Sequence, residues 1–360
     1  MKNLFLWSTG IIFLLHSCLS GTNEKFIISK GVNINHWLSQ SHKRGIYRDT
    51  VFTEKDIVYI KSMGFDHIRL PFDEEQLWDD TGKKNDTAFT LLHNAIGWCQ
   101  ANHLRVIADL HILRSFHFNR KDNKLWDDIR EQDKFVNLWV QLSAEMKKYP
   151  VWLIGYELMN EPVTDNPDNW NHLVSRTIDT LRKLEPLRKI IIGSNMWQST
   201  TTFKDLRVPE NDSNLILSFH FYEPFLLTHH QASWTYIRHF KGPVVYPGKI
   251  IPEPIFAALP DSTKDVIKQH NTLFNRDTLE SLVRLAINRA NELNLPVFCG
   301  EWGCRQIIDH PTRMQWYRDM IWIFNKYRIP WDIWGYYGEF GLFNHQTGEL
   351  NKEMLKIITN

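Results

Sequence analysis

The sequence predicts an α/β fold, a single (β/α)8 TIM barrel with a small subdomain inserted after its sixth strand. Three observations predict it: short apolar runs alternate with segments of helical periodicity, eight such runs occur, and polar side chains gather where the runs end. Strands that alternate with helices form a parallel sheet, and closing that sheet into a barrel removes its exposed edges. The chain has 360 residues, which is enough for one such barrel.

The eight predicted strands are short segments rich in β-branched and apolar residues. The clearest helix between them covers residues 278–294, where apolar side chains repeat at three- and four-residue steps and form one face. In chain order, the predicted strands are Phe26–Ile34, His67–Phe72, Arg105–His111, Leu153–Glu161, Lys189–Ser194, Ile216–Tyr222, Pro296–Gly303 and Ile333–Tyr337.

The connection after the sixth strand is too long for a simple crossover. It covers residues 224–275 and is rich in aromatic residues, histidine and proline. Loops of this length are usually functional or contain local structure. We expect this insertion to lie on the C-terminal face of the barrel, either as a wall of a substrate cleft or as a structural flap without substrate contact.

Residues 1–20 have the pattern of a signal peptide. The apolar run from Leu4 to Leu15 is too short to span a bilayer comfortably, and small and polar residues follow it. The segment 15–18 resembles a bacterial lipoprotein processing site, with the lipid on Cys18; simple cleavage is the alternative. We therefore expect residues 21–360 to form the mature barrel domain, which would be secreted, periplasmic or at the cell surface.

Composition excludes several other classes of function. The formal net charge is +1, so no global field favours nucleic acid or an anionic membrane. The cysteine and histidine spacings do not match a metal site, and lipid on Cys18 would leave an odd number of cysteines, which argues against a disulfide framework. We expect a monomer without a metal or cofactor, attached to a membrane only through that lipid.

Two glutamates at strand ends point to chemistry that needs two carboxyl groups. Glu161 ends the fourth predicted strand and Glu301 lies in the seventh, and catalytic groups of such barrels sit at the C-terminal ends of strands. Cleavage of a glycosidic bond needs one protonated carboxyl group for the leaving oxygen and one carboxylate that attacks the anomeric carbon. A separation of about 5–5.5 Å would fit a retaining mechanism.

Nearly the whole mature chain resembles glycoside hydrolase family 5, the cellulase-type family, and is most similar to its small single-module bacterial endoglucanases. The resemblance rests on residues in matching order and strand positions: Arg69, His111, Asn160-Glu161-Pro162, His220, Tyr222, Glu301 and Trp334. It implies that Glu161 is the acid/base and Glu301 the nucleophile. Ile112 departs from many relatives, which have a second histidine there, so one substrate contact differs.

The resemblance also implies roles for the surrounding residues. Arg69 and Tyr222 would keep Glu301 ionised, and Asn160 would bond the sugar 2-hydroxyl. His111 and His220 would orient the sugar and the two carboxylates. Trp334 would stack under the sugar ring. Two further candidates come from position alone, because Asn35 follows the first strand and Trp197 follows the fifth.

The expected activity is endo-acting hydrolysis of a β-linked glucan, either β-1,4 or mixed β-1,3-1,4. An exo-β-glucosidase, a mannanase or a xyloglucanase would use the same catalytic residues with a different cleft. A glycan-binding protein without activity is a further alternative, but binding alone does not need both Glu161 and Glu301.

Overall fold

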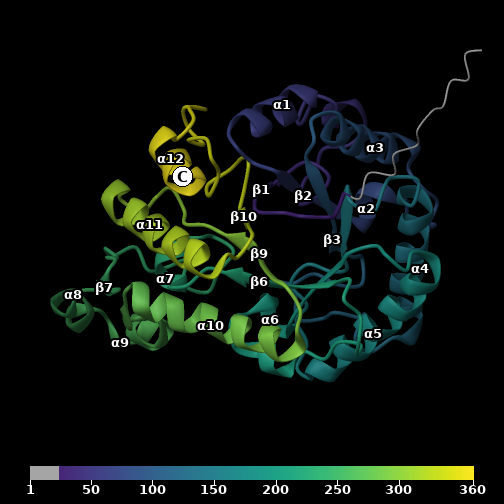
Figure 1. Ribbon diagram of the computed structural model, residues 1–360. Coiled ribbons are helices and arrows are strands. Elements are labelled where there is room, and N and C mark those ends of the chain that lie inside the picture. Colours follow the sequence, from purple (N-terminus) through teal and green to yellow (C-terminus); the bar gives the residue numbers. More distant parts are fainter. Residues whose placement is uncertain (1–23) are drawn as a thin grey trace, which may run out of the picture.

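The computed structural model describes residues 24–360 and confirms the predicted barrel (Figure 1). All strand pairs of the barrel are parallel, and its sheet closes in the order β1-β10-β9-β6-β5-β4-β3-β2. The predicted signal peptide and Cys18 lie outside the described residues. The barrel strands are β1 (Lys30–Asn33), β2 (His67–Asp73), β3 (Arg105–Ile112), β4 (Ile154–Glu157), β5 (Ile190–Gly193), β6 (Leu215–Phe221), β9 (Val297–Trp302) and β10 (Trp331–Ile333).

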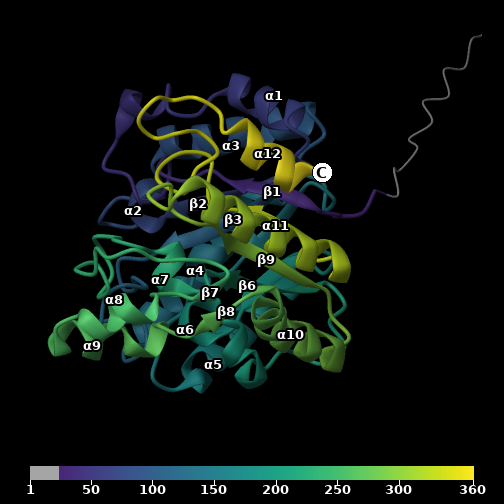
Figure 2. The same ribbon diagram turned by 90° about the vertical axis from the view of Figure 1, so that its left-hand side faces the viewer.

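Helices form the outer layer of the barrel (Figures 1 and 2). The crossover between β5 and β6 is unusual because its helices are short: it contains α6 (Asn195–Gln198) and the 3₁₀ helix η2 (Thr200–Asp205), and η2 packs against α10. The remaining elements of this layer are η1 (Gly45–Arg48), α1 (Glu54–Ser62), α2 (Glu74–Leu77), α3 (Asp86–Ala101), α4 (Ile129–Met146), α5 (Pro167–Leu184), α10 (Arg276–Leu293), α11 (His310–Tyr327) and α12 (Lys352–Thr359).

Side-chain caps explain where several helices begin. The Asn85 Oδ1 atom accepts a hydrogen bond from the backbone N–H of Ala88 at 3.1 Å, and Asn275 caps α10 through the N–H of Thr278 at 3.0 Å. These bonds satisfy N–H groups that have no partner within the helix. The helix predicted over 278–294 is therefore present as α10, which ends where Asn294 adopts a left-handed φ of 52°.

Two predicted strands extend too far toward the C-terminus. The fourth strand ends at Glu157 rather than Glu161, and Glu161 itself has φ 46°, a left-handed conformation that no strand can contain. The eighth strand is Trp331–Ile333 instead of 333–337, because its ladder pairs Lys30 with Trp331 and Val32 with Ile333. Both catalytic-face loops thus begin earlier than the sequence pattern indicates.

The first strand is also shorter than predicted, because its ladder begins at Lys30 and the apolar residues before it close the bottom of the barrel. Phe26 and Ile28 are buried in a small apolar cluster at the N-terminal ends of the strands. The other members of this cluster are Ile107, Ile191, Ile216 and Phe298. A side chain on Gly155 would meet the ring of Phe26 at 2.9 Å, so glycine leaves room for this plug.

The segment between β6 and α10 contains short elements that pack onto the barrel. It includes α7 (Phe225–Thr228), α8 (Glu253–Ala258), α9 (Asp261–Ile267), η3 (Lys268–His270) and the antiparallel pair β7 (Gly248–Lys249) and β8 (Leu273–Phe274). Helices α8 and α9 lie at the edge of the molecule (Figure 1). Buried side chains such as Ile237 and Ile250 join the main hydrophobic core, so the insertion shares that core.

Cys99, Cys299 and Cys304 are free, buried thiols. Within residues 24–360, no helix combines the length and the apolar character that a membrane span requires.

Candidate active site

A single guanidinium group organises the C-terminal end of the barrel. Arg69 in β2 is fully buried, and its Nε lies 2.6 Å from the carboxylate of Glu157. Its Nη1 donates to Glu301 at 2.7 Å, and its Nη2 lies 3.0 Å from Asp109 and 2.8 Å from Oδ1 of Asn160. One cation therefore ties together the ends of β2, β3, β4 and β9.

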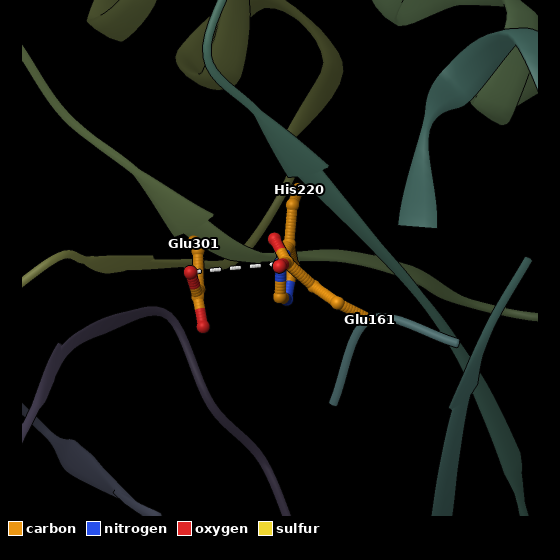
Figure 3. A group of neighbouring side chains, drawn as sticks. All are labelled: Glu161, His220 and Glu301. Carbon is orange, nitrogen blue, oxygen red and sulfur yellow. Dashed lines mark hydrogen bonds and ion pairs between the residues drawn. The ribbon is translucent and has the colours of Figure 1, made fainter. Parts of the chain in front are cut away.

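Glu161 and Glu301 point toward each other, with His220 beside them (Figure 3). One carboxylate oxygen of Glu161 lies within 4.8 Å of one carboxylate oxygen of Glu301. This close approach is consistent with the short separation of the carboxyl groups in retaining glycosidases, which is about 5–5.5 Å. The side chains of Glu161 and Glu301 are 12% and 6% exposed, so both are nearly buried but not sealed from solvent.

The surroundings of the two carboxyl groups differ in charge. Burial and then the negative charge of Glu301 raise the pKa of Glu161 well above its ordinary value. Burial raises the pKa of Glu301 as well, but Arg69 and a hydrogen bond from the Tyr222 hydroxyl, 3.0 Å away, oppose that rise. When the pair holds one proton, this asymmetry places it on Glu161 and leaves Glu301 ionised.

His220 in β6 contacts both carboxyl groups. Its Nδ1 lies 2.9 Å from Glu161 and 3.6 Å from Glu301. Burial, followed by the positive charge of Arg69, lowers the pKa of His220 far below its ordinary value, so the imidazole is neutral. A neutral ring orients Glu161 without the full positive charge that would strongly favour its ionised form, which keeps that carboxyl group suited to act as an acid. Imidazole and carboxylate can also bind Zn²⁺, but the bond to Glu161 explains the cluster without an ion.

His111 and Trp334 form one stacked pair on the same face. Their rings are 5.7 Å apart and nearly parallel, at 8°. The Nδ1 of His111 is bonded to Asp109 at 2.7 Å and its Nε2 lies 3.0 Å from the side-chain amide of Gln40. His111 therefore has protein partners on both nitrogens and supports the indole of Trp334, which is partly exposed.

The two candidates chosen by position lie on either side of this centre. Asn35 is buried, and its amide exchanges two hydrogen bonds with the backbone of Tyr337, at 2.9 and 3.1 Å, in the loop that follows Trp334. Trp197 is 43% exposed, and its Nε1 donates to the carbonyl of Phe118 at 3.0 Å. Trp197 thus presents an open indole face, whereas Asn35 has its polar atoms engaged by the protein; substrate contact remains a prediction for both.

Three buried residues of this network were not among the predicted site residues. Asp109 was visible at the end of the third strand, but its bond to Arg69 depends on the barrel closing. Glu157 lay inside the predicted fourth strand and resembled an ordinary strand residue. Gln198 follows Trp197 and carried no sequence signal, yet its side chain bonds to Glu157 at 3.2 Å and to the backbone N–H of Glu161 at 3.0 Å.

Comparison with known proteins identifies the family of this chain. Residues 25–340 match the family model of cellulase, glycosyl hydrolase family 5. Endoglucanase C of Acetivibrio thermocellus is 29% identical over 336 residues, which cover 91% of this chain and 97% of that protein. Cellodextrinase A of Ruminococcus flavefaciens is 27% identical, over 84% of this chain and 83% of that protein.

Solved structures share the fold at lower identity. The cellulose synthase subunit Z of Clostridioides difficile superposes with a TM-score of 0.74 at 21% identity, covering 93% of this chain and 100% of that one. Thermotoga maritima Cel5A, solved with mannotriose, gives a TM-score of 0.73 at 22% identity and covers 93% of this chain and 98% of that one. With the family model matching most of its length, the chain belongs to the cellulase family, glycosyl hydrolase family 5.

Proposed function

We propose that the protein is a retaining endo-β-glucanase in which Glu161 is the acid/base and Glu301 the nucleophile. The observation that carries this proposal is the short carboxylate separation, within 4.8 Å, combined with the unequal surroundings of the two groups. A carboxylate paired with a guanidinium can attack, and a nearly buried carboxyl group beside a neutral imidazole can deliver a proton.

In the first step, a Glu301 oxygen attacks the anomeric carbon of the sugar while the bond to the leaving oxygen breaks. Glu161 transfers its proton to that oxygen, so the departing chain leaves as a neutral alcohol. The product is a covalent ester between Glu301 and the sugar. Arg69 donates to Oδ1 of Asn160, which leaves the amide NH₂ of Asn160 as a donor for the sugar 2-hydroxyl.

In the second step, water replaces Glu301 at the anomeric carbon. Ester formation has removed the negative charge of Glu301, so the pKa of Glu161 falls and Glu161 can accept the proton of the attacking water. The ester bond breaks, Glu301 returns to its carboxylate form, and the sugar keeps its original anomeric configuration.

We further propose a β-linked glucan as the substrate, because two relatives aligned over 97% of their own length are named endoglucanases. A mannan is the second candidate, because the Cel5A complex with mannotriose shares the barrel. Hydrolysis of a panel of β-glucans and mannans, with products separated by length and anomers resolved by NMR, distinguishes these substrates, endo from exo action, and retention from inversion.

Replacement of each glutamate tests the catalytic assignment. We expect Glu301→Ala and Glu161→Ala each to lower kcat by orders of magnitude without loss of folding. Azide should restore turnover of an activated aryl glycoside by Glu161→Ala, because the small anion attacks the intermediate without needing a base. Hydrolysis at the wild-type rate by Glu301→Ala would contradict the assignment of the nucleophile.

We also propose that the protein is exported as a monomer and anchored by a lipid on Cys18. The support is the apolar run of residues 4–15 and the cysteine that follows it. Labelling of cells with a palmitate analogue should modify the wild type and spare Cys18→Ala; labelling of neither would favour simple cleavage.

A further inference from the structure

We infer that Gln198 is a positioning residue for Glu161, and that it sets where the acid/base stands relative to the nucleophile. The inference rests on the roles proposed above for Glu161 and Glu301. Gln198 is fully buried, and its side chain spans the space between the turn after β4 and the side chain of Glu157.

The first argument is the backbone of Glu161. Its φ of 46° is left-handed, a conformation that residues with a Cβ rarely adopt and that surrounding structure must hold. The Oε1 of Gln198 accepts the hydrogen bond from the backbone N–H of Glu161 at 3.0 Å. A buried amide therefore fixes the peptide from which the catalytic side chain extends.

The second argument is that the partner turn is built to present Gln198. Met196, Trp197 and Gln198 have φ of 56°, 60° and 53°, so three successive residues are left-handed within α6 (Asn195–Gln198). The N–H of Trp197 bonds to the carbonyl of Pro162 at 3.3 Å, which ties this turn to the residue after Glu161. The loops after β4 and β5 thus hold each other in place.

The third argument is the set of hydrogen bonds that connects Gln198 to the charged groups of the site. The Nε2 of Gln198 donates to Oε1 of Glu157 at 3.2 Å, and the other oxygen of Glu157 accepts from Arg69 at 2.6 Å. Arg69 in turn contacts Glu301 at 2.7 Å. A continuous path of buried hydrogen bonds therefore runs from the peptide of Glu161 through Gln198 to the nucleophile, and an apolar side chain at position 198 would break it twice.

Substitution of a glycine next to Gln198 offers a second, independent way to displace the Gln198 side chain. A Cβ on Gly193, at the end of β5, would lie 2.2 Å from Cγ and 2.3 Å from Nε2 of Gln198. Gly193→Ala should therefore displace the amide without changing any polar group, and it should produce the same kinetic signature as Gln198→Leu.

The experiment compares substrates with poor and good leaving groups. For Gln198→Leu we expect kcat on cello-oligosaccharides to fall about 10- to 100-fold, since a misplacement of about 1 Å can cost that much. On an activated aryl β-cellobioside, kcat and KM should fall together, because the intermediate accumulates, and azide should restore turnover. A general loss of structure would lower both activities in parallel without a response to azide.

Two further variants keep the test decisive. Gln76→Leu is the matched control, because Gln76 is a fully buried glutamine bonded to Arg48 at 2.9 Å and to the Ser41 carbonyl at 2.8 Å, away from both carboxylates. It should not change the ratio of the two activities. Gln198→Glu should retain activity at low pH, where the introduced carboxyl group is protonated, and lose it as pH rises and that group repels Glu157.

The outcomes separate this inference from the proposed function. Suppose that azide restores turnover of Glu161→Ala. If Gln198→Leu, Gly193→Ala and Gln198→Glu then show wild-type kinetics, or lose both activities in parallel without a response to azide, the positioning role of Gln198 is wrong and the mechanism stands. If Glu161→Ala itself shows no azide response, the mechanism fails first. Circular dichroism and thermal midpoints identify any variant that does not fold.

Discussion

At the scale of single residues, catalysis depends on how strongly the positive charge of Arg69 stabilises each of the carboxylates around it. Asp109, Glu157 and Glu301 all contact Arg69, so the guanidinium cannot fully compensate each of them. Burial raises the pKa of Asp109 to about 7, even with Arg69 opposing the rise. The hydroxyl of Tyr222 is therefore important, because it is an extra donor directed at the nucleophile alone.

Removing that hydroxyl should move the acidic limb of the pH profile. The bond from Tyr222 lowers the pKa of Glu301, so Tyr222→Phe raises it, and the limb of kcat/KM that requires ionised Glu301 moves to higher pH. A hydrogen bond to a charged group contributes about 1.5–3 kcal/mol, which corresponds to a shift of about one to two pH units. Profiles of kcat/KM from about pH 4 to about pH 10 measure this shift, because burial already raises the pKa of Glu301 above its ordinary range.

The control for this variant is another tyrosine bonded to a carboxylate. Tyr246 donates to Asp319 at 2.7 Å, in the insertion and away from the two glutamates. Tyr246→Phe should reduce stability and leave the pH profile in place. An unchanged acidic limb in Tyr222→Phe would show that Arg69 alone keeps Glu301 ionised.

At the scale of elements, the sequence predicted strand order well and strand ends poorly. Apolar periodicity identified all the barrel strands and α10, because burial between sheet and helices determines those residues. It could not locate the left-handed turn at Glu161, since that conformation depends on Gln198, which belongs to another loop. The residues expected to contact substrate were thus easier to predict than the buried residues that hold these side chains in place.

One buried ion pair links two elements far apart in the chain and should make stability depend on pH. His67 at the start of β2 lies 2.6 Å from Asp332 in β10, and both are fully buried. Burial lowers the pKa of His67, but Asp332 and then Asp66 outweigh that effect and raise it to about 9. The stabilisation is complete below the ordinary value of 6.5 and is lost as pH rises through about 9.

Asp332→Asn should weaken this dependence, because Asp66 still contacts His67 in the variant. Breaking a buried pair costs about 3–5 kcal/mol, so we expect a lower free energy of unfolding at neutral pH and a flatter change between pH 6.5 and about 9. The matched control is Glu353→Gln, which weakens exposed contacts with His310 and Arg318, each at 2.7 Å, and should change stability little. Denaturant unfolding at several pH values compares them, and equal losses for both variants would refute the argument.

At the scale of the whole molecule, stability and catalysis occupy opposite ends of the barrel. The paired carboxylates and their supporting loops follow the C-terminal ends of the strands, whereas Phe26 and Ile28 close the N-terminal end. The sequence placed residues 26–34 in a strand because apolar character does not distinguish a paired strand from a plug. The difference matters because a plug can be weakened without moving any residue at the catalytic end.

Phe26→Ala tests this separation. Truncating a buried phenylalanine costs about 3–5 kcal/mol, because contacts are lost and a cavity remains beside Ile191 and Phe298. We expect a clearly lower thermal midpoint together with wild-type kcat and KM at temperatures where the variant is folded. Ile27→Ala is the matched control, because Ile27 is 63% exposed between two buried neighbours and should change neither property. A fall in kcat for Phe26→Ala while it remains folded would show that the plug and the catalytic loops are coupled through the strands, and the two ends could then no longer be treated as independent.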